Sequence, residues 1–401
     1  MTLVIGNALL YLITLLVYWH KQRRMDYGFV TIAFYLIVAI CCIFEYIAEP
    51  HRWELTAWPF VYLFIANLIL FLPLFSSSDK IAAKVYYNRS INIPGLQIFC
   101  GIYIIFALIT TICYFPLAWD SLQSGAWASI RDSTYEEEFH LFQNPILNII
   151  ANLSPHYTIA VIVIYFFLLT QPRISKAFKT TLLISTITPM ALTALVIAAR
   201  GHIFTLLFNF LLGFLCFRQY IPKRTKRTLL VWAIVFGGIL GLYTIAVTIA
   251  RFGQESDSSL LYYFGHSMLT FDYGLTDTID TYGKGAYTFR RFVNYVVHDL
   301  DWTLGTHFGT SFFTFVGSLY IDFGPLGTMI AVTLLAISVR VLIRKHNLDL
   351  ADMFIYLFYI STVLNGALIT APDLGWRCLL AFIIYIMLKT LGKHHASAHA
   401  R

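Results

Sequence analysis

Long apolar runs recur along the whole chain and constrain its fold more than any other feature. The run from 228 to 250 is largely apolar on every helical face. It is long enough to cross a bilayer, because a spanning helix needs about 20 mostly apolar residues. Charged residues make up 12% of the 401 residues, against about 25% in soluble domains. An outer-membrane barrel would instead need segments of about ten residues that alternate in polarity. The sequence therefore predicts an all-α polytopic membrane protein.

Eleven runs are predicted as membrane spans, and the basic residues between them indicate the topology. The predicted spans are 2–19, 27–47, 59–77, 94–118, 155–171, 180–199, 203–217, 228–250, 324–343, 351–370 and 378–392. Twenty of the 28 lysines and arginines lie at the ends of spans 1, 3, 5, 7, 9 and 11 or in the segments after them. By the positive-inside rule that side is cytoplasmic, so the N-terminus is expected outside and the C-terminus inside. We interpret 1–401 as a single integral membrane domain.

The predicted cytoplasmic connections are short, whereas two long connections are predicted outside. The short ones leave no room for a nucleotide-binding domain, and no phosphate-binding glycine-rich motif appears. This excludes an activity driven by cytosolic ATP binding. The long outer loops are 119–154 and 251–323. Function is expected on this face, and 251–323 is the candidate active-site loop.

Cysteine placement and net charge exclude other classes. The cysteines lie inside or at the edges of apolar runs without metal-ligand spacing, and they are Cys41, Cys42, Cys100, Cys113, Cys216 and Cys378. We expect no disulfide, no required metal and no cofactor. The net charge of +7 is spread between the spans, so topology explains it and no nucleic-acid partner is expected.

The basic residues predicted outside differ in type from the cytoplasmic set. They are Arg52, Arg131, Arg200, Arg251, Lys284, Arg290, Arg291 and Arg377. Seven of these eight are arginine, whereas half of the cytoplasmic set is lysine. Topology does not distinguish the two residues, but phosphate recognition favours the guanidinium group, which binds two oxygens at once. The bias favours a phosphorylated partner, with pairing to outer acidic residues or lipid headgroups as an equal alternative for any one arginine.

Three of these arginines lie where a predicted span meets the outer face. Arg200 lies between spans 6 and 7, Arg251 ends span 8 and Arg377 opens span 11. If the spans bundle, the three converge on one cavity at the membrane surface. Arg200 is the strongest candidate, because a connection of three residues fixes its depth. Its alternative role is to complement the macrodipole at a helix C-terminus.

The late outer loop contains AYTFRRFVNYVVHDLDW, which has helical periodicity. Its apolar stripe is Phe289, Val293, Val296, Val297 and Leu300. Its polar side is Arg290, Asn294, His298 and Asp301, flanked by Arg291 and Asp299. This side combines anion-binding, hydroxyl-binding and proton-accepting groups, although any amphipathic helix turns polar residues toward solvent.

Three further residues of this loop have both a functional and a structural interpretation. His307 lies in a stretch rich in Gly and Thr and is either a base or a solvated histidine. Asp322 comes just before a span and Pro325, so helix capping explains it. Loop aromatics such as Tyr263 either stack on sugar rings or anchor the chain at the interface.

The whole layout resembles the oligosaccharide repeat-unit polymerases, the O-antigen polymerase (Wzy-type) family. The resemblance is carried by Ala199-Arg200-Gly201 opening an apolar helix and by GSLYIDFGPLGTMI leading into the span after the late loop. About eleven spans and a large late outer loop add to it. The similarity extends over most of the chain, and the O-antigen ligases share much of it.

The resemblance implies a GT-C-like glycosyltransferase of the bacterial inner (cytoplasmic) membrane that polymerises undecaprenyl-pyrophosphate-linked repeat units on the outer face. The implied partners are the lipid-linked glycan donor and acceptor, membrane lipid and a chain-length regulator protein. The candidate catalytic residues are His298, Asp299 and His307. The candidate pyrophosphate ligands are Arg200, Arg251, Arg290, Arg291 and Arg377. The candidate sugar-binding residues are Asn294, Asp301 and Tyr263.

Two alternatives remain open. One is an O-antigen ligase-type transfer of the finished glycan to another acceptor. The other is a flippase or secondary transporter for the same lipid-linked sugar. Ion-coupled transporters usually carry ionisable residues near the bilayer midplane. The middles of these spans hold almost none, which disfavours transport.

Overall fold

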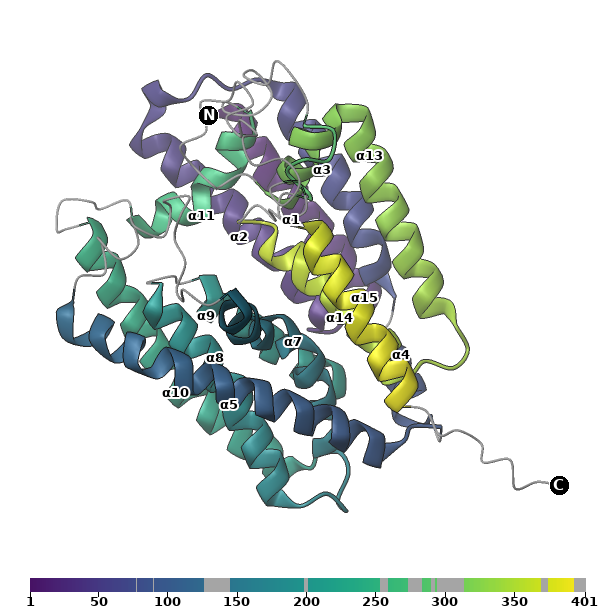
Figure 1. Cartoon of the computed structure of the whole chain (residues 1–401). Helices are drawn as coiled ribbons and strands as arrows, with labels where there is room; N and C mark the ends of the chain where they lie inside the picture. The colour runs from purple at the N-terminus through teal and green to yellow at the C-terminus, as the bar shows by residue number, and fades with distance from the viewer. Residues whose placement is uncertain are drawn as a thin grey trace. The chain divides into compact units, whose positions relative to one another are not determined.

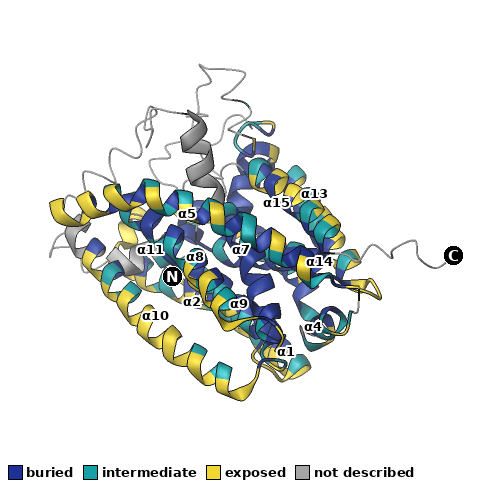
Figure 2. Ribbon diagram, turned by 60° about the horizontal axis from the view of Figure 1, so that its bottom comes forward, coloured by how far each residue is buried: buried dark blue, intermediate teal, exposed yellow. Residues whose placement is uncertain are grey.

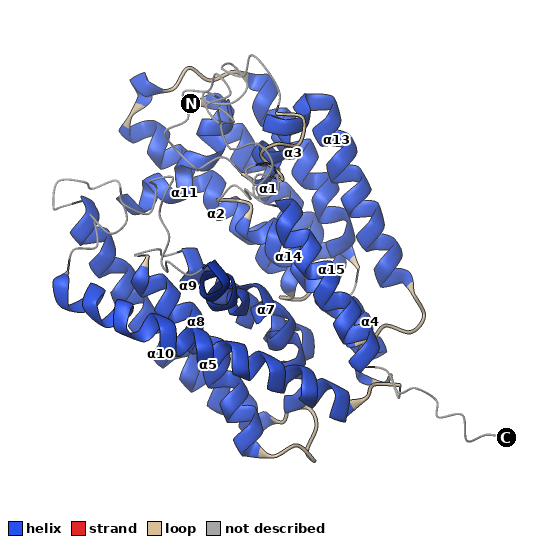
Figure 3. Ribbon diagram, viewed as in Figure 1, coloured by secondary structure: helices blue, strands red, loops and turns tan. Residues whose placement is uncertain are grey.

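The computed structural model describes residues 1–76, 78–88, 90–125, 145–197, 201–252, 259–272, 283–289, 293, 314–368 and 374–392. Side chains are described in these ranges except at 78, 145–155, 248–252 and 259–263. In these ranges the regular elements are helices joined by turns, and there is no β-strand (Figure 3). Eight of the described helices are long and apolar enough to cross a membrane. The architecture is that of a multi-pass membrane protein, as the apolar runs predict.

Each predicted span overlaps a helix of the structure. The described elements are α1 (Thr2–Gln22), α2 (Tyr27–Ala48), η1 (Pro50–Arg52), α3 (Ala57–Phe71), η2 (Leu72–Phe75), α4 (Ser78–Tyr86), α5 (Ile93–Ser124), α7 (Pro145–Leu169), α8 (Lys176–Val196), α9 (Gly201–Phe217), α10 (Lys223–Phe252), α11 (Ser259–Thr270), α13 (Phe315–Arg344), α14 (Leu350–Asn365) and α15 (Leu374–Leu391). The candidate spans are α1, α2, α3 with η2, α5, α8, α10, α13 and α15. Helices α9 and α14, and the part of α7 whose side chains are described (His156–Leu169), are apolar over 10–17 residues. Eleven crossings and their orientation therefore stay a prediction.

The helices form two compact units (Figure 1). The first contains Met1–Ile81, Asp257–Lys345 and Tyr359–Leu380, and in it α2 packs against α1 and α11 while α3 packs against α13. The second contains Ala82–Ser256, His346–Phe358 and Ala381–Arg401, and in it α5 packs against α7 and α8. The described residues of the late outer loop from Ser259 onward belong to the first unit.

Buried tyrosine hydroxyls connect the helices of the first unit. Tyr35 of α2 donates to the carbonyl of Val363 in α14 at 2.9 Å. Asn67 of α3 donates through Nδ2 to the Tyr11 hydroxyl of α1, also at 2.9 Å. A polar group buried without a partner costs about 1–3 kcal/mol. These bonds therefore select one arrangement of the four helices.

Helix α10 is exposed around most of its circumference. Figure 2 shows it as an almost continuous exposed helix, with Ile234 at 66% and Leu242 at 70% exposure. A helix that is apolar all round needs apolar surroundings. A bilayer supplies them, which agrees with the span predicted at 228–250.

Helix α13 is broken near its middle. Gly324 has φ 64° and ψ −172°, a region that only glycine enters without strain. Pro325 follows and has no backbone N–H to donate. The nine residues before the break are mostly buried. The sequence analysis assigned residues 315–323 to the outer loop. A Gly-Pro pair is as typical of the start of a helix as of a break within one, so the sequence did not show that the helix begins earlier.

Two carboxylates and a lysine join the start of α14 to the end of α15. Asp349 accepts from the Asp352 backbone N–H at 2.9 Å, and Asp352 accepts from the Asp349 N–H at 3.3 Å. Lys389 Nζ lies 2.5 Å from Asp349 Oδ2 and 3.0 Å from Asp352 Oδ2. Lys389 was expected only to mark the cytoplasmic side. It also neutralises two carboxylates whose side chains are 9% and 1% exposed.

Lys389→Met should therefore destabilise the protein. Removing one partner of a fully buried ion pair costs roughly 3–5 kcal/mol. We expect about 2–3 kcal/mol here, because the Lys389 side chain is 21% exposed and water screens part of the interaction. The midpoint of thermal unfolding in detergent measures the effect. Lys223→Met, at an exposed lysine of α10, is the control and should leave the midpoint unchanged.

Candidate functional site

Most residues predicted for the site lie outside the described residues. These are Arg200, Arg290, Arg291, Asn294, His298, Asp299, Asp301 and His307. The structure describes the backbone of Arg251 at the end of α10 and of Tyr263 in α11. It describes Arg377 in full, as an exposed residue in the first turn of α15. The convergence of the arginines therefore stays a prediction. The described residues show how the segment 283–289 of the late loop is bound.

The segment 283–289 precedes the predicted polar face and is bound to α13. The backbone N–H groups of Gly283 and Lys284 donate to the carbonyls of Ile321 and Asp322, each at 2.9 Å. The Asp322 carboxylate accepts from the N–H of Tyr287 at 2.9 Å through Oδ1. It also accepts from the N–H of Thr288 at 2.6 Å through Oδ2. The predicted capping role was wrong in its target, because Asp322 caps a turn of the late loop instead of the span that follows it.

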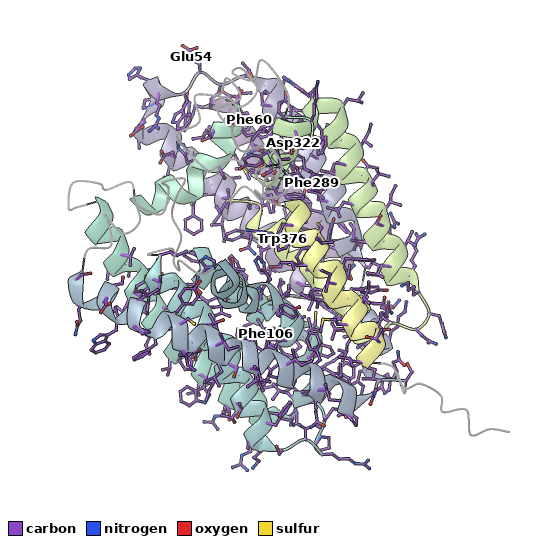
Figure 4. The ribbon with its side chains drawn as sticks, viewed as in Figure 1. Glu54, Phe60, Phe106, Phe289, Asp322 and Trp376 are labelled. Carbon is purple, nitrogen blue, oxygen red and sulfur yellow. The ribbon has the colours of Figure 1, made fainter. Side chains whose placement is uncertain are left out.

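The same segment is bound to α15 on another side. The N–H of Gly375 donates to the carbonyl of Thr288 at 2.9 Å. Gly375 also packs so closely on Phe289 (labelled with Asp322 in Figure 4) that an added Cβ would lie 2.2 Å from the ring. Only glycine fits this contact. Segment 283–289 of the late loop is therefore bound both to α13 and to the first turn of α15, where Arg377 lies.

Two backbone hydrogen bonds lie at the start of the predicted amphipathic helix. The N–H of Phe289 donates to the carbonyl of Gly285 at 2.9 Å, and the N–H of Val293 donates to the carbonyl of Phe289 at 3.0 Å. Both bonds have the i→i−4 spacing of an α-helix. They agree with the helical periodicity of 286–302 at its first turn, while the polar face lies outside the described residues.

A second buried aspartate binds the end of α11 to the start of α3. Asp272 accepts from the backbone N–H of Thr56 at 2.8 Å and from its hydroxyl at 2.9 Å. Next to it, the Phe271 ring stacks on Tyr62 with centroids 6.1 Å apart, and Tyr320 of α13 contacts both rings edge-on. The late loop is thus held to the helices at Asp272 as well as at Asp322.

His266 of α11 is a buried polar residue that the sequence analysis missed. Its imidazole is 2% exposed and meets the Trp53 ring edge-on at 5.0 Å. The Arg52 guanidinium group lies over the Trp53 ring, 5.1 Å from the ring centroid. It also forms an ion pair with Glu49 at 2.8 Å. Burial, assisted by the charge of Arg52 and opposed by Glu49, lowers the pKa of His266 to about 4. The imidazole is therefore neutral at pH 7.

The buried polar groups described above hold segments of the chain together, and they form no metal site in the described residues. In the part of the chain that the structure describes, no group of three or more His, Cys, Asp or Glu side chains could hold a metal ion. All six cysteines are free thiols. The chain shows no significant match to any protein-family model, to any curated protein or to any solved structure.

The buried imidazole predicts a pH dependence of stability. Between pH 6.5 and about 4 the unfolded chain binds a proton at His266 that the folded chain does not. The free energy of unfolding should therefore fall as the pH drops through this range, by at most about 1.4 kcal/mol per pH unit. His266→Gln should remove that slope, measured as thermal midpoints from pH 7 to 4.5. His51→Gln, at an exposed imidazole of η1, should keep it, and an equal slope in all three proteins would contradict the assignment.

Proposed function

We propose that this protein is a membrane glycosyltransferase that extends a lipid-pyrophosphate-linked glycan on the non-cytoplasmic face of the membrane. The donor is an oligosaccharide repeat unit on undecaprenyl pyrophosphate, and the acceptor is the sugar of a second lipid-linked unit. In this proposal the protein lies in the bacterial inner membrane. The proposal joins the family resemblance and the bias toward arginine on the outer face with the anchoring of the late loop.

The observation that carries the proposal is the hydrogen bond from Gly375 to Thr288. Arg377 lies two positions after Gly375. Arg290 and Arg291 lie two and three positions after Thr288. Two outer segments that carry arginines in the sequence are therefore joined at their starting points. A diphosphate leaving group needs several cationic donors around its oxygens, which these segments supply in this proposal.

The position of Arg377 adds support. A cation in the first turn of a helix opposes the macrodipole and costs roughly 0.3–1 kcal/mol. Helix stability therefore does not account for an exposed arginine at the start of α15. An anion at this place would be favoured both by the guanidinium group and by the helix N-terminus.

The proposed glycan transfer requires three kinds of residue on the non-cytoplasmic face. Arginines at headgroup depth stabilise the negative charge that develops on the departing pyrophosphate. A base accepts the proton of the attacking sugar hydroxyl, and His298, Asp299 and His307 are the candidates. Asn294, Asp301 and Tyr263 would orient the sugars. No nucleotide takes part, because the donor already carries its activated leaving group.

The reaction can be tested with the purified protein. Incubated with undecaprenyl-pyrophosphate-linked repeat units and without any nucleotide, it should produce a ladder of longer glycans on a gel. The ladder forms because the product of each transfer is again a lipid-linked substrate. One addition to a different acceptor would indicate ligation instead. Lipid movement across vesicles without a glycan product would indicate flipping.

Arg200→Lys should abolish the ladder without lowering expression. The substitution keeps the positive charge but removes the planar fork that binds two phosphate oxygens, and losing such a contact costs about 100-fold or more in kcat. Arg227→Lys, at an exposed position of α10 on the predicted cytoplasmic side, is the matched control and should keep the ladder. Full activity of Arg200→Lys would remove Arg200 from the site.

A further inference from the structure

Three separate parts of the chain meet at Asp322. The carboxylate, 1% exposed, accepts from two consecutive N–H groups of the late loop, those of Tyr287 and Thr288. The carbonyl of the same residue accepts from Lys284. Through Thr288 the contact continues to Gly375 at the start of α15. One acidic side chain thus connects α13, the loop segment and, at one remove, α15.

The hydrogen bonds of the Asp322 carboxylate are strong because the acceptor is charged and shielded from water. Hydrogen bonds to an ionised group contribute about 1.5–3 kcal/mol each, roughly twice the value of neutral ones. A carboxylate buried without such partners would be far more costly. Helix starts leave their first N–H groups without intrahelical acceptors, and here the carboxylate accepts from the N–H groups of Tyr287 and Thr288.

We infer that Asp322 is a positioning residue that holds segment 283–289 of the late outer loop in the orientation needed for transfer. This inference rests on the function proposed above. Asp322 does not act on substrate directly, because both of its oxygens are occupied by the loop backbone. Its role is to fix the helical turn that leads into the segment carrying His298 and Asp299. Transfer depends on this, since a displacement of about 1 Å at a reacting group can cost about 100-fold in rate.

The substitution Asp322→Asn tests the inference with little change in shape. The amide retains one acceptor oxygen and turns an NH₂ group toward the other N–H, so one of the two bonds is replaced by a repulsive contact. The movement of the loop is read at residue 288, which is 6% exposed. In the Thr288→Cys background, peptide mass spectrometry measures labelling of this cysteine by a water-soluble maleimide. The exposed thiol of Cys378 serves as the internal reference.

We expect Asp322→Asn to raise the labelling of residue 288 relative to Cys378 by roughly tenfold, as loss of one charged hydrogen bond implies. Measured without the reporter cysteine, kcat for glycan addition should fall by about 100-fold, with a smaller change in KM for the donor. The thermal midpoint should fall as well, because a charged hydrogen bond of about 1.5–3 kcal/mol is lost. A merely structural role would lower the midpoint but would leave kcat of the folded protein unchanged.

Thr288→Val is the matched control. The Thr288 hydroxyl is buried and has no hydrogen-bond partner, and the substitution keeps the backbone N–H that Asp322 binds. This variant should keep the full ladder and the wild-type kcat. If Asp322→Asn does not fold, Gly375→Ala displaces Phe289 from the opposite side of the segment and should produce the same two effects.

The outcomes separate this inference from the proposed function. Unchanged labelling in both Asp322→Asn and Gly375→Ala would show that the loop is not held here and would overturn the inference. Increased labelling with an undiminished ladder would overturn the positioning role. If the wild-type protein makes no ladder, the proposed function and the role in transfer fail together, while the labelling still decides whether Asp322 holds the loop.

Discussion

The described part of the late loop depends on carboxylates that are buried and hydrogen-bonded. An ionised side chain in apolar surroundings is tolerated only when hydrogen bonds replace its water. Asp322 satisfies this condition with two loop N–H groups, and Asp272 does so with the N–H and the hydroxyl of Thr56. Each aspartate joins residues far apart in the sequence. Together they hold the late loop at two places.

The sequence predicted the helices well, because a spanning helix is a local property. A run of about 20 apolar residues is sufficient evidence for it, and each predicted span overlaps a helix of the structure. The helix at 259–270 was not predicted. It has only twelve residues and includes His266, Ser267 and Thr270, so it does not read as an apolar run.

The contacts that anchor the loop could not be read from the sequence. Asp322 binds backbone N–H groups 34 and 35 residues away, and every residue except proline carries such a group. Asp272 and Thr56 are 216 residues apart. A carboxylate that precedes a Gly-Pro pair most simply indicates a cap for the next helix. The type of interaction was predicted, therefore, but its partner was not.

The break at Gly324 decides which way this carboxylate faces. Asp322 and Leu326 are four residues apart and would share one side of a regular helix. Leu326 is 75% exposed and begins a stripe with Ile330, Leu334 and Ile337 that suits contact with lipid tails. In an unbroken helix Asp322 would therefore point at hydrocarbon. The non-helical conformation of Gly324 instead turns the carboxylate toward the protein interior, so that a lipid-facing stripe and a buried ionic contact occupy one continuous stretch of chain.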